Sequence, residues 1–185
     1  MSKKAAIFFA TGYEECEALI TVDIMRRAGV EISMVSVTGD KTVTSSHNVP
    51  VVMDKLFDEV DFAELDMMIL PGGMPGTRNL AAHECLMDLM KRHHALGGTV
   101  AAICAAPGLV VSQLDNLEGV RFTCYDGFEE HLIAKGAEYV KAPAVADGTI
   151  ITGRGAGCAI DFGLKILEHL RGPEAAAAVR KGLMI

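Results

Sequence analysis

Cys104 lies where a short apolar run, residues 99–103, meets a stretch of small and aliphatic residues that begins with Ala105. The run is typical of a buried strand, and the stretch after it can begin a helix. A thiol at such a turn faces outward, as in the nucleophile elbow of the α/β-hydrolases, although the glycines of that motif are absent. Free amides and the helix dipole stabilise a thiolate, so we expect a lowered pKa for the Cys104 thiol. The alternative is a small buried side chain without a reactive role.

Glu17 is the second residue with a pattern that indicates chemistry, because a carboxyl group beside a nucleophile can accept and return a proton. It falls in a helix predicted over residues 14–28, which carries acidic residues in its first turn. Its inward stripe is predicted to hold Ile20, Ile24 and Ala28 as well. A carboxyl group on that stripe needs a partner or keeps its proton, since burial raises its pKa. The alternative is that Glu17 caps a helix end in partial solvent.

Gly72 and Gly73 follow another apolar run, residues 66–70, and leave backbone N–H groups uncovered. Such groups can bind an oxyanion, although the pair can equally be a simple turn. In parallel sheets the functional groups gather beyond the carboxyl ends of the strands. We therefore expect the glycine pair, Cys104 and Glu17 to converge in one crevice. Together they supply a nucleophile, a proton carrier and oxyanion donors for attack on a carbonyl group.

The elements that must position these residues alternate between apolar runs and amphipathic stretches. This alternation predicts an α/β fold, a mostly parallel central sheet with helices on both faces. Pro50 makes the β-prone segment 41–53 an edge or a loop. The predicted strands cover residues 5–10, 31–37, 66–70, 99–103, 120–124 and 149–152, with an extended hairpin arm over 138–146. The predicted helices cover residues 14–28 and 82–96, a stretch that opens after Gly157, and a last helix from Pro173.

The length of 185 residues favours a single domain over residues 1–185. No apolar run approaches the roughly 20 residues that cross a bilayer, and the first apolar run is too short for a secretory signal. We therefore expect a soluble cytoplasmic protein. Five scattered cysteines indicate neither a disulfide framework nor a zinc site. A net charge of −7 without a cluster of Lys and Arg argues against nucleic acid as a partner.

The glycine-rich stretch from Gly153 to Gly157 invites a nucleotide-binding interpretation. The dinucleotide fingerprint fails because Cys158 stands where its third glycine is required, and no G-K-[ST] sequence occurs in the chain. We therefore expect no cofactor and no metal.

Five motifs, in this order along nearly the whole chain, resemble the ThiJ/PfpI superfamily. The resemblance is greatest to the branch of the Parkinsonism-associated protein deglycase and bacterial YajL. It implies a flavodoxin-like three-layer sandwich and, usually, a homodimer. The motifs are Gly12-Tyr-Glu-Glu-Cys-Glu17, Val22-Asp-Ile-Met-Arg-Arg-Ala-Gly29, Leu70-Pro-Gly-Gly73, Ala101-Ala-Ile-Cys-Ala105 and Gly153-Arg-Gly-Ala-Gly-Cys-Ala159.

The resemblance also implies roles for the site residues. Cys104 would be an easily oxidised nucleophile and Glu17 a protonated carboxyl group that is hydrogen-bonded to it. The amides of Gly73 and Ala105 would form an anion pocket. The activities attributed to this branch are cofactor-free conversion of methylglyoxal and glyoxal to hydroxy acids, deglycation of early adducts, redox sensing and chaperone-like holding.

The chain departs from the family pattern at the rim of this site. Where relatives often carry a histidine after the elbow helix, this chain has Thr123-Cys-Tyr125, which makes peptidase activity doubtful. Tyr125 can still offer a hydroxyl group, and Cys124 a resolving thiol, although a structural role is the simpler interpretation of both. His47 takes the place of a partner-chain arginine, which weakens the expectation of anion affinity.

Two classes of function follow from these residues. One is an enzyme that acts on α-oxoaldehydes or their early amine and thiol adducts. The other is a redox sensor or holdase chaperone in which Cys104 is oxidised to sulfinic acid without turnover. In either case we expect a homodimer through the helix of residues 14–28 and the segment around His47, with Leu19 and Val22 covered by the partner. The alternative is a monomer in which the segment 41–53 of the same chain covers these apolar side chains.

Overall fold

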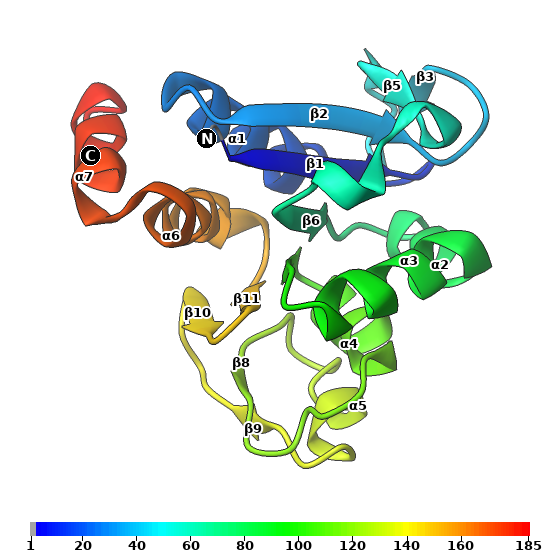
Figure 1. The fold of residues 1–185 in the computed structure, drawn as a ribbon, viewed down its shortest axis with the longest axis vertical. Helices are drawn as coiled ribbons and strands as arrows, with labels where there is room; N and C mark the ends of the chain where they lie inside the picture. Colours follow the sequence, from blue (N-terminus) through cyan, green and yellow to red (C-terminus); the bar gives the residue numbers. More distant parts are fainter. Residues whose placement is uncertain (1–2) are drawn as a thin grey trace.

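The structure is a computed structural model that describes residues 3–185, and it is built around one seven-stranded sheet (Figure 1). All neighbouring strands are parallel except β10 and β11, which form an antiparallel hairpin. The predicted α/β class with a mostly parallel sheet is thus confirmed. In spatial order the strands are β10 (Ala144–Asp147), β11 (Ile150–Gly153), β7 (Thr99–Ile103), β6 (Met67–Leu70), β1 (Lys4–Phe9), β2 (Glu31–Ser36) and β5 (Lys55–Leu56).

Helices cover both faces of the sheet and make a three-layer sandwich. The alternation along β1 shows why: Ile7 and Phe9 belong to one core, whereas Ala6 and Phe8 belong to the other. One face carries α1 (Glu15–Arg27), α6 (Ala159–Arg171) and α7 (Pro173–Gly182). The other carries α2 (Gly76–Ala81), α3 (Glu84–Ala95), α4 (Ala106–Leu109) and α5 (Glu130–Ile133). Among residues 3–185, no helix combines the length and apolarity needed to cross a membrane.

Two short ribbons lie outside the central sheet. The predicted strand over residues 120–124 is reduced to β8 (Arg121–Phe122), which pairs with β9 (Glu138–Tyr139) and does not join the central sheet. Pro50 begins a ribbon strand, β4 (Pro50–Val52), which pairs with β3 (Thr42–Thr44). Four 3₁₀ turns complete the described elements: η1 (Phe57–Glu59), η2 (Phe62–Glu64), η3 (Val111–Gln113) and η4 (Ala156–Cys158).

The buried face of α1 is wider than the predicted stripe. Ile24 and Glu17 are buried as predicted, but Ile20 is only half-buried. Val22, predicted to face a partner, is 5% exposed and belongs to the core of its own chain. The reason is that α1 packs against α6 as well as the sheet, and at Gly163 of α6 a Cβ would lie 2.7 Å from Ile24 Cδ1. The prediction that Val22 needs a partner chain to leave water was therefore wrong.

Candidate active site

Cys104 directly follows β7 and adopts a backbone conformation that is rare for a residue with a side chain. Its φ angle of 66° lies in the left-handed region, which costs about 1–3 kcal/mol for a non-glycine residue. Two hydrogen bonds hold it there: its N–H donates to the Gly153 carbonyl at 3.0 Å, and its carbonyl accepts from the Tyr125 N–H at 2.9 Å. The sharp turn predicted between strand and helix is therefore real, and it leaves the Cys104 side chain partly exposed.

Glu17 lies in the first turn of α1, and only 1% of its surface is exposed. Its Oε2 atom accepts a hydrogen bond from the Gly72 N–H at 2.8 Å. Its Oε1 atom is buried and has no hydrogen-bond partner among the described residues. The side chain of Glu14 caps the helix by accepting from the Glu17 N–H at 2.7 Å. One oxygen of the Glu17 carboxyl group, Oε2, is thus hydrogen-bonded to the backbone, and the other, Oε1, remains free for proton exchange.

Gly72 allows the thiol and the carboxyl group to approach the same piece of backbone. A Cβ atom at this position would lie 2.5 Å from Cys104 Cβ, 2.5 Å from Glu17 Oε2 and 3.0 Å from Cys104 Sγ. Real side chains do not tolerate such distances, so this packing requires glycine. The convergence of Gly72, Cys104 and Glu17 expected from the strand ends is present in the structure.

The environment of Glu17 favours its protonated form. Burial raises the pKa of the carboxyl group to about 7, and the charge of Glu14 adds to the rise. The Gly72 amide and the interaction with the Cys104 thiol oppose it. The predicted upward shift is confirmed, and a pKa near neutrality suits a group that must both accept and return a proton.

The Cys104 thiol behaves differently from the prediction. Burial raises its pKa to about 12, and the negative charge of Glu17 acts in the same direction. The amides of Gly73 and Ala105 lie at the thiol and oppose the rise without overcoming it. The prediction of a lowered pKa was wrong because α4 has only four residues and therefore a weak dipole, while the side chain is largely enclosed.

Burial raises the pKa of both groups, and the thiol keeps its proton more firmly, so the pair holds a single proton once Glu17 has ionised. Transfer of that proton from sulfur to Glu17 creates a thiolate beside the amides of Gly73 and Ala105. The site can thus generate its nucleophile on demand with Glu17 as general base.

Tyr125 and His47 lie at the rim of the site, and their side chains do not make the contacts with the thiol or the carboxyl group that the sequence suggested. Tyr125 contacts Cys104 through its backbone N–H, while the residue as a whole is 53% exposed and its ring contacts Phe128. His47 follows β3, and its Nδ1 atom lies 2.9 Å from Glu15 Oε1. Its side chain is 70% exposed. Neither side chain makes a hydrogen bond to Cys104 or Glu17 within residues 3–185.

An ion pair that was not predicted from the sequence joins the two residues that follow Tyr125 and Gly153, the backbone partners of Cys104. The Arg154 Nη2 atom donates to both carboxylate oxygens of Asp126, at 2.7 and 2.8 Å. The Tyr139 hydroxyl group also donates to Asp126, at 3.4 Å. The two partners are 28 positions apart, and neither belongs to a periodic or charged run, so no pattern links them.

One group of described residues has donor atoms close enough to hold a metal ion. Glu14, Glu15 and His47 offer ligand atoms within 4.8 Å of one another at the surface. The contact between His47 and Glu15 already accounts for this proximity without an ion. We assign no metal or cofactor to the site.

Comparison with known proteins places this geometry in a family. The DJ-1/PfpI family matches residues 3–169. Protein dj-1beta of Drosophila melanogaster is 35% identical over the whole of this chain and 98% of its own length. The glutathione-independent glyoxalase DJR-1.2 of Caenorhabditis elegans is 30% identical over 93% of this chain and 90% of its own.

Solved structures agree with the sequence comparison. The crystal structure of Drosophila melanogaster DJ-1beta has a TM-score of 0.93 at 35% identity and covers 100% of this chain and 99% of its own. The structure of oxidized Toxoplasma gondii DJ-1 has a TM-score of 0.92 at 32% identity, with 99% and 98% covered. Because both sequence and fold match over almost the full length, the chain belongs to the DJ-1/PfpI family.

Proposed function

We propose that this protein is a cofactor-independent enzyme of the glyoxalase or deglycase type. Its substrates would be α-oxoaldehydes or their early adducts with amines and thiols. The observation that carries the proposal is the packing of the Cys104 thiol and the Glu17 carboxyl group against Gly72, with the amides of Gly73 and Ala105 at the sulfur. The relative named a glutathione-independent glyoxalase supports the same chemistry.

The proposed reaction begins with proton transfer from Cys104 Sγ to Glu17. The sulfur then forms a bond to the aldehyde carbon of methylglyoxal, and the carbonyl electron pair moves to oxygen. The Gly73 and Ala105 amides stabilise the negative charge that develops near the sulfur. The resulting oxyanion takes this proton back from Glu17 and becomes a hemithioacetal, which leaves the Glu17 carboxylate ionised for the next step.

The second half of the reaction moves a proton and releases the product. Glu17 accepts the proton from the former aldehyde carbon and returns it to the neighbouring carbon, while the hydroxyl proton of the hemithioacetal passes to the ketone oxygen, and the product is a 2-hydroxy thioester. Water cleaves the thioester to lactate and the free thiol. The aldehyde carbon is oxidised and the ketone carbon is reduced within one molecule, so no external oxidant or cofactor takes part.

The proposed enzyme is a homodimer in which α1 and the β3–β4 ribbon form the contact. The ribbon is tied to the start of α1 by hydrogen bonds from Gly12 N–H to the Thr44 carbonyl and from Ser46 N–H to the Tyr13 carbonyl. Val49 and Val52 of the ribbon are exposed, and Leu19 and Ile20 of α1 are only partly buried. A twofold contact here would cover these apolar side chains.

A second candidate function is redox sensing without turnover, in which Cys104 would react with two molecules of peroxide to give a sulfinic acid and two molecules of water. The partly exposed sulfur, the adjacent amides and the Glu17 carboxyl group favour it. The fold similarity to an oxidized DJ-1 of Toxoplasma gondii supports it.

The test is lactate formation from methylglyoxal in the absence of glutathione. We expect turnover by the unmodified protein and none by Cys104→Ser or Glu17→Gln. Cys85→Ser is the matched control, because Cys85 is also exposed but lies on α3 outside the site. If the unmodified protein forms no lactate and Cys104 gains two oxygen atoms under peroxide, redox sensing would replace enzymatic turnover as the proposed function.

A further inference from the structure

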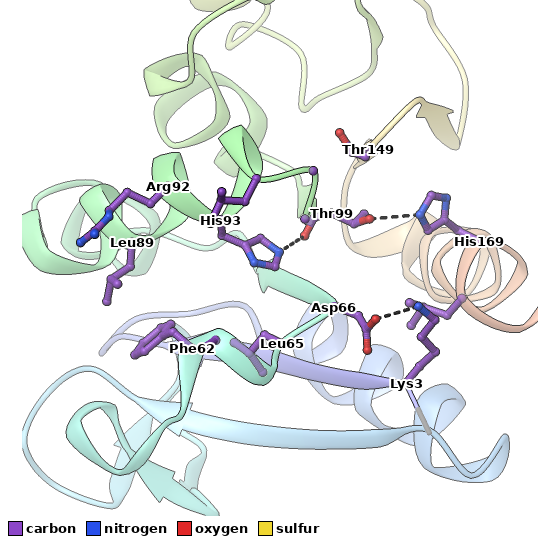
Figure 2. Close-up of a pocket in the computed structure, with 15 residues that line it drawn as sticks. Lys3, Phe62, Leu65, Asp66, Leu89, Arg92, His93, Thr99, Thr149 and His169 are labelled. Carbon is purple, nitrogen blue, oxygen red and sulfur yellow. Dashed lines mark hydrogen bonds and ion pairs between the residues drawn. The ribbon is translucent and has the colours of Figure 1, made fainter. Parts of the chain in front are cut away.

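A cavity, shown in Figure 2, opens at the end of β7 opposite to Cys104. Its volume is about 700 Å³, within the range of small-molecule sites. It lies at the amino ends of β1, β6 and β7, where Thr99 begins the strand that Cys104 follows. Five strand residues separate the two sites by roughly 17 Å at about 3.3 Å per residue. A molecule bound here is therefore not the substrate of Cys104.

The floor of this cavity is built from fixed polar groups around Thr99, which is 6% exposed. The His93 Nε2 atom lies 3.2 Å from the Thr99 carbonyl, and the His169 Nε2 atom lies 3.1 Å from the Thr99 hydroxyl (Figure 2). Since a carbonyl only accepts, His93 Nε2 carries a proton and its Nδ1 is the free acceptor when the ring is neutral. A Cβ at Gly98 would overlap the His93 ring, so the glycine lets the ring lie against the backbone.

The charges around the cavity are predominantly positive. Asp66 is the one carboxylate of the lining, and it already accepts from Lys3 Nζ at 2.7 Å and from the Lys4 N–H at 2.9 Å. Arg92 is exposed and makes no ion pair with any residue from 3 to 185. Its guanidinium can hold a carboxylate through two hydrogen bonds. The cavity thus offers a cation that lacks a counterion.

The remaining walls are apolar. Leu89 projects from α3 on the same side as Arg92, and Phe62 and Leu65 face it across the cavity (Figure 2). Leu96 and Leu170 extend this surface. An apolar wall beside an unpaired guanidinium matches a ligand with an apolar body and one anionic end.

We propose that this cavity is a second binding site, for a small monocarboxylate with an aromatic or branched apolar body. The carboxylate binds Arg92, and the body packs against Leu89, Phe62 and Leu65. This binding site does not depend on the chemistry at Cys104, so the proposal holds whether or not the protein has the proposed enzymatic activity.

The test is a titration with 2-naphthoate, followed by its fluorescence, because the protein contains no tryptophan that would interfere. We expect saturable binding, weakened at least tenfold by Arg92→Glu. Arg78→Glu is the matched control, since Arg78 is another exposed arginine but lies on α2, and it should leave Kd within twofold. The neutral 2-naphthylmethanol should bind at least tenfold more weakly than the acid.

Amide NMR shifts locate the bound probe. We expect the largest changes at Leu65, Leu89 and Arg92, which the proposed ligand contacts, and the same changes in Cys104→Ser. Absence of saturable binding, equal affinity for the alcohol, an unchanged Kd in Arg92→Glu, or shifts centred on Gly72 and Gly73 would each overturn the proposal.

Discussion

The Arg154 Nη2 atom donates hydrogen bonds to both carboxylate oxygens of Asp126, at 2.7 and 2.8 Å. This ion pair joins the two segments that hydrogen-bond to the backbone of Cys104. Asp126 follows Tyr125, whose N–H donates to the Cys104 carbonyl. Arg154 follows Gly153, whose carbonyl accepts from the Cys104 N–H. The ion pair thus closes a ring of contacts around the strained residue, and we expect both partners to act as positioning residues for the proposed nucleophile.

Asp126→Asn is expected to lower kcat/KM for methylglyoxal about threefold to tenfold, because a small displacement of a reacting group is costly. Stability should change little, since the pair is exposed to solvent. The measurements are steady-state kinetics and thermal unfolding. Asp23→Asn is the control, because it breaks a similar exposed pair with Arg27 on α1. An equal loss of kcat/KM in both variants would show that the effect is not specific to the contacts around Cys104.

Glu17→Gln is expected to stabilise the protein at pH 8 and to have little effect below about pH 4.5. The folded pKa of Glu17 is raised from 4.5 to about 7, so its favourable contribution is complete below 4.5 and is lost as the pH rises through 7. The difference corresponds to about 3 kcal/mol in the free energy of unfolding. Urea unfolding at both pH values measures it. If Glu17→Gln were less stable than the unmodified protein at pH 8, the claim that Glu17 is a buried carboxylate without a compensating charge would be contradicted.

The alkylation of Cys104 by iodoacetamide is expected to accelerate as the pH rises through about 7. Below that value Glu17 is protonated and cannot accept the thiol proton, because burial raises its pKa to about 7. Mass spectrometry of the peptide that contains Cys104 gives the rate. In Glu17→Gln the inflection near pH 7 should disappear. An unchanged inflection in that variant would assign it to another group.

Gly72→Ala is expected to abolish turnover, because the new Cβ would displace both Cys104 and Glu17. Circular dichroism and kinetics would separate a disturbed site from a lost fold. Gly182→Ala is the control, since a Cβ at this helical position of α7 meets nothing within 4 Å. Activity retained by Gly72→Ala would show that the close packing is not required.

Val52→Asp is expected to shift the proposed homodimer toward the monomer in sedimentation at micromolar protein. The side chain is 65% exposed on the β3–β4 ribbon, so the change should not disturb the core of one protomer. Leu96→Asp is the control, because Leu96 is also exposed but ends α3 elsewhere on the surface. A monomeric unmodified protein, or a dimer insensitive to Val52→Asp, would remove the ribbon from the interface.

The features that the sequence predicted well are those encoded in short stretches. The apolar run before Cys104 is β7 within the predicted bounds, and the break at Pro71-Gly-Gly73 ends β6 where expected. The convergence of Cys104, Glu17 and Gly72 followed from one rule, that parallel strands end at a common edge.

The features that the sequence did not predict depend on distant contacts. Val22 is buried because α6, more than 130 residues later, packs against α1. The thiol pKa depends on the balance between enclosure and two amides, which the spacing of residues does not reveal. The cavity around Thr99 unites α3, α6 and the amino ends of three strands, and no motif marks it.

The free oxygen of Glu17 has a consequence for how the nucleophile is made. A lone buried cysteine would have to send its proton to bulk water and would leave a new charge in the interior. Above about pH 7 the acceptor is already ionised and already enclosed, so the proton moves between two neighbouring groups and the total charge of the pair stays at −1. Activation of the sulfur therefore adds no net charge to the interior, and its rate is expected to be independent of buffer concentration.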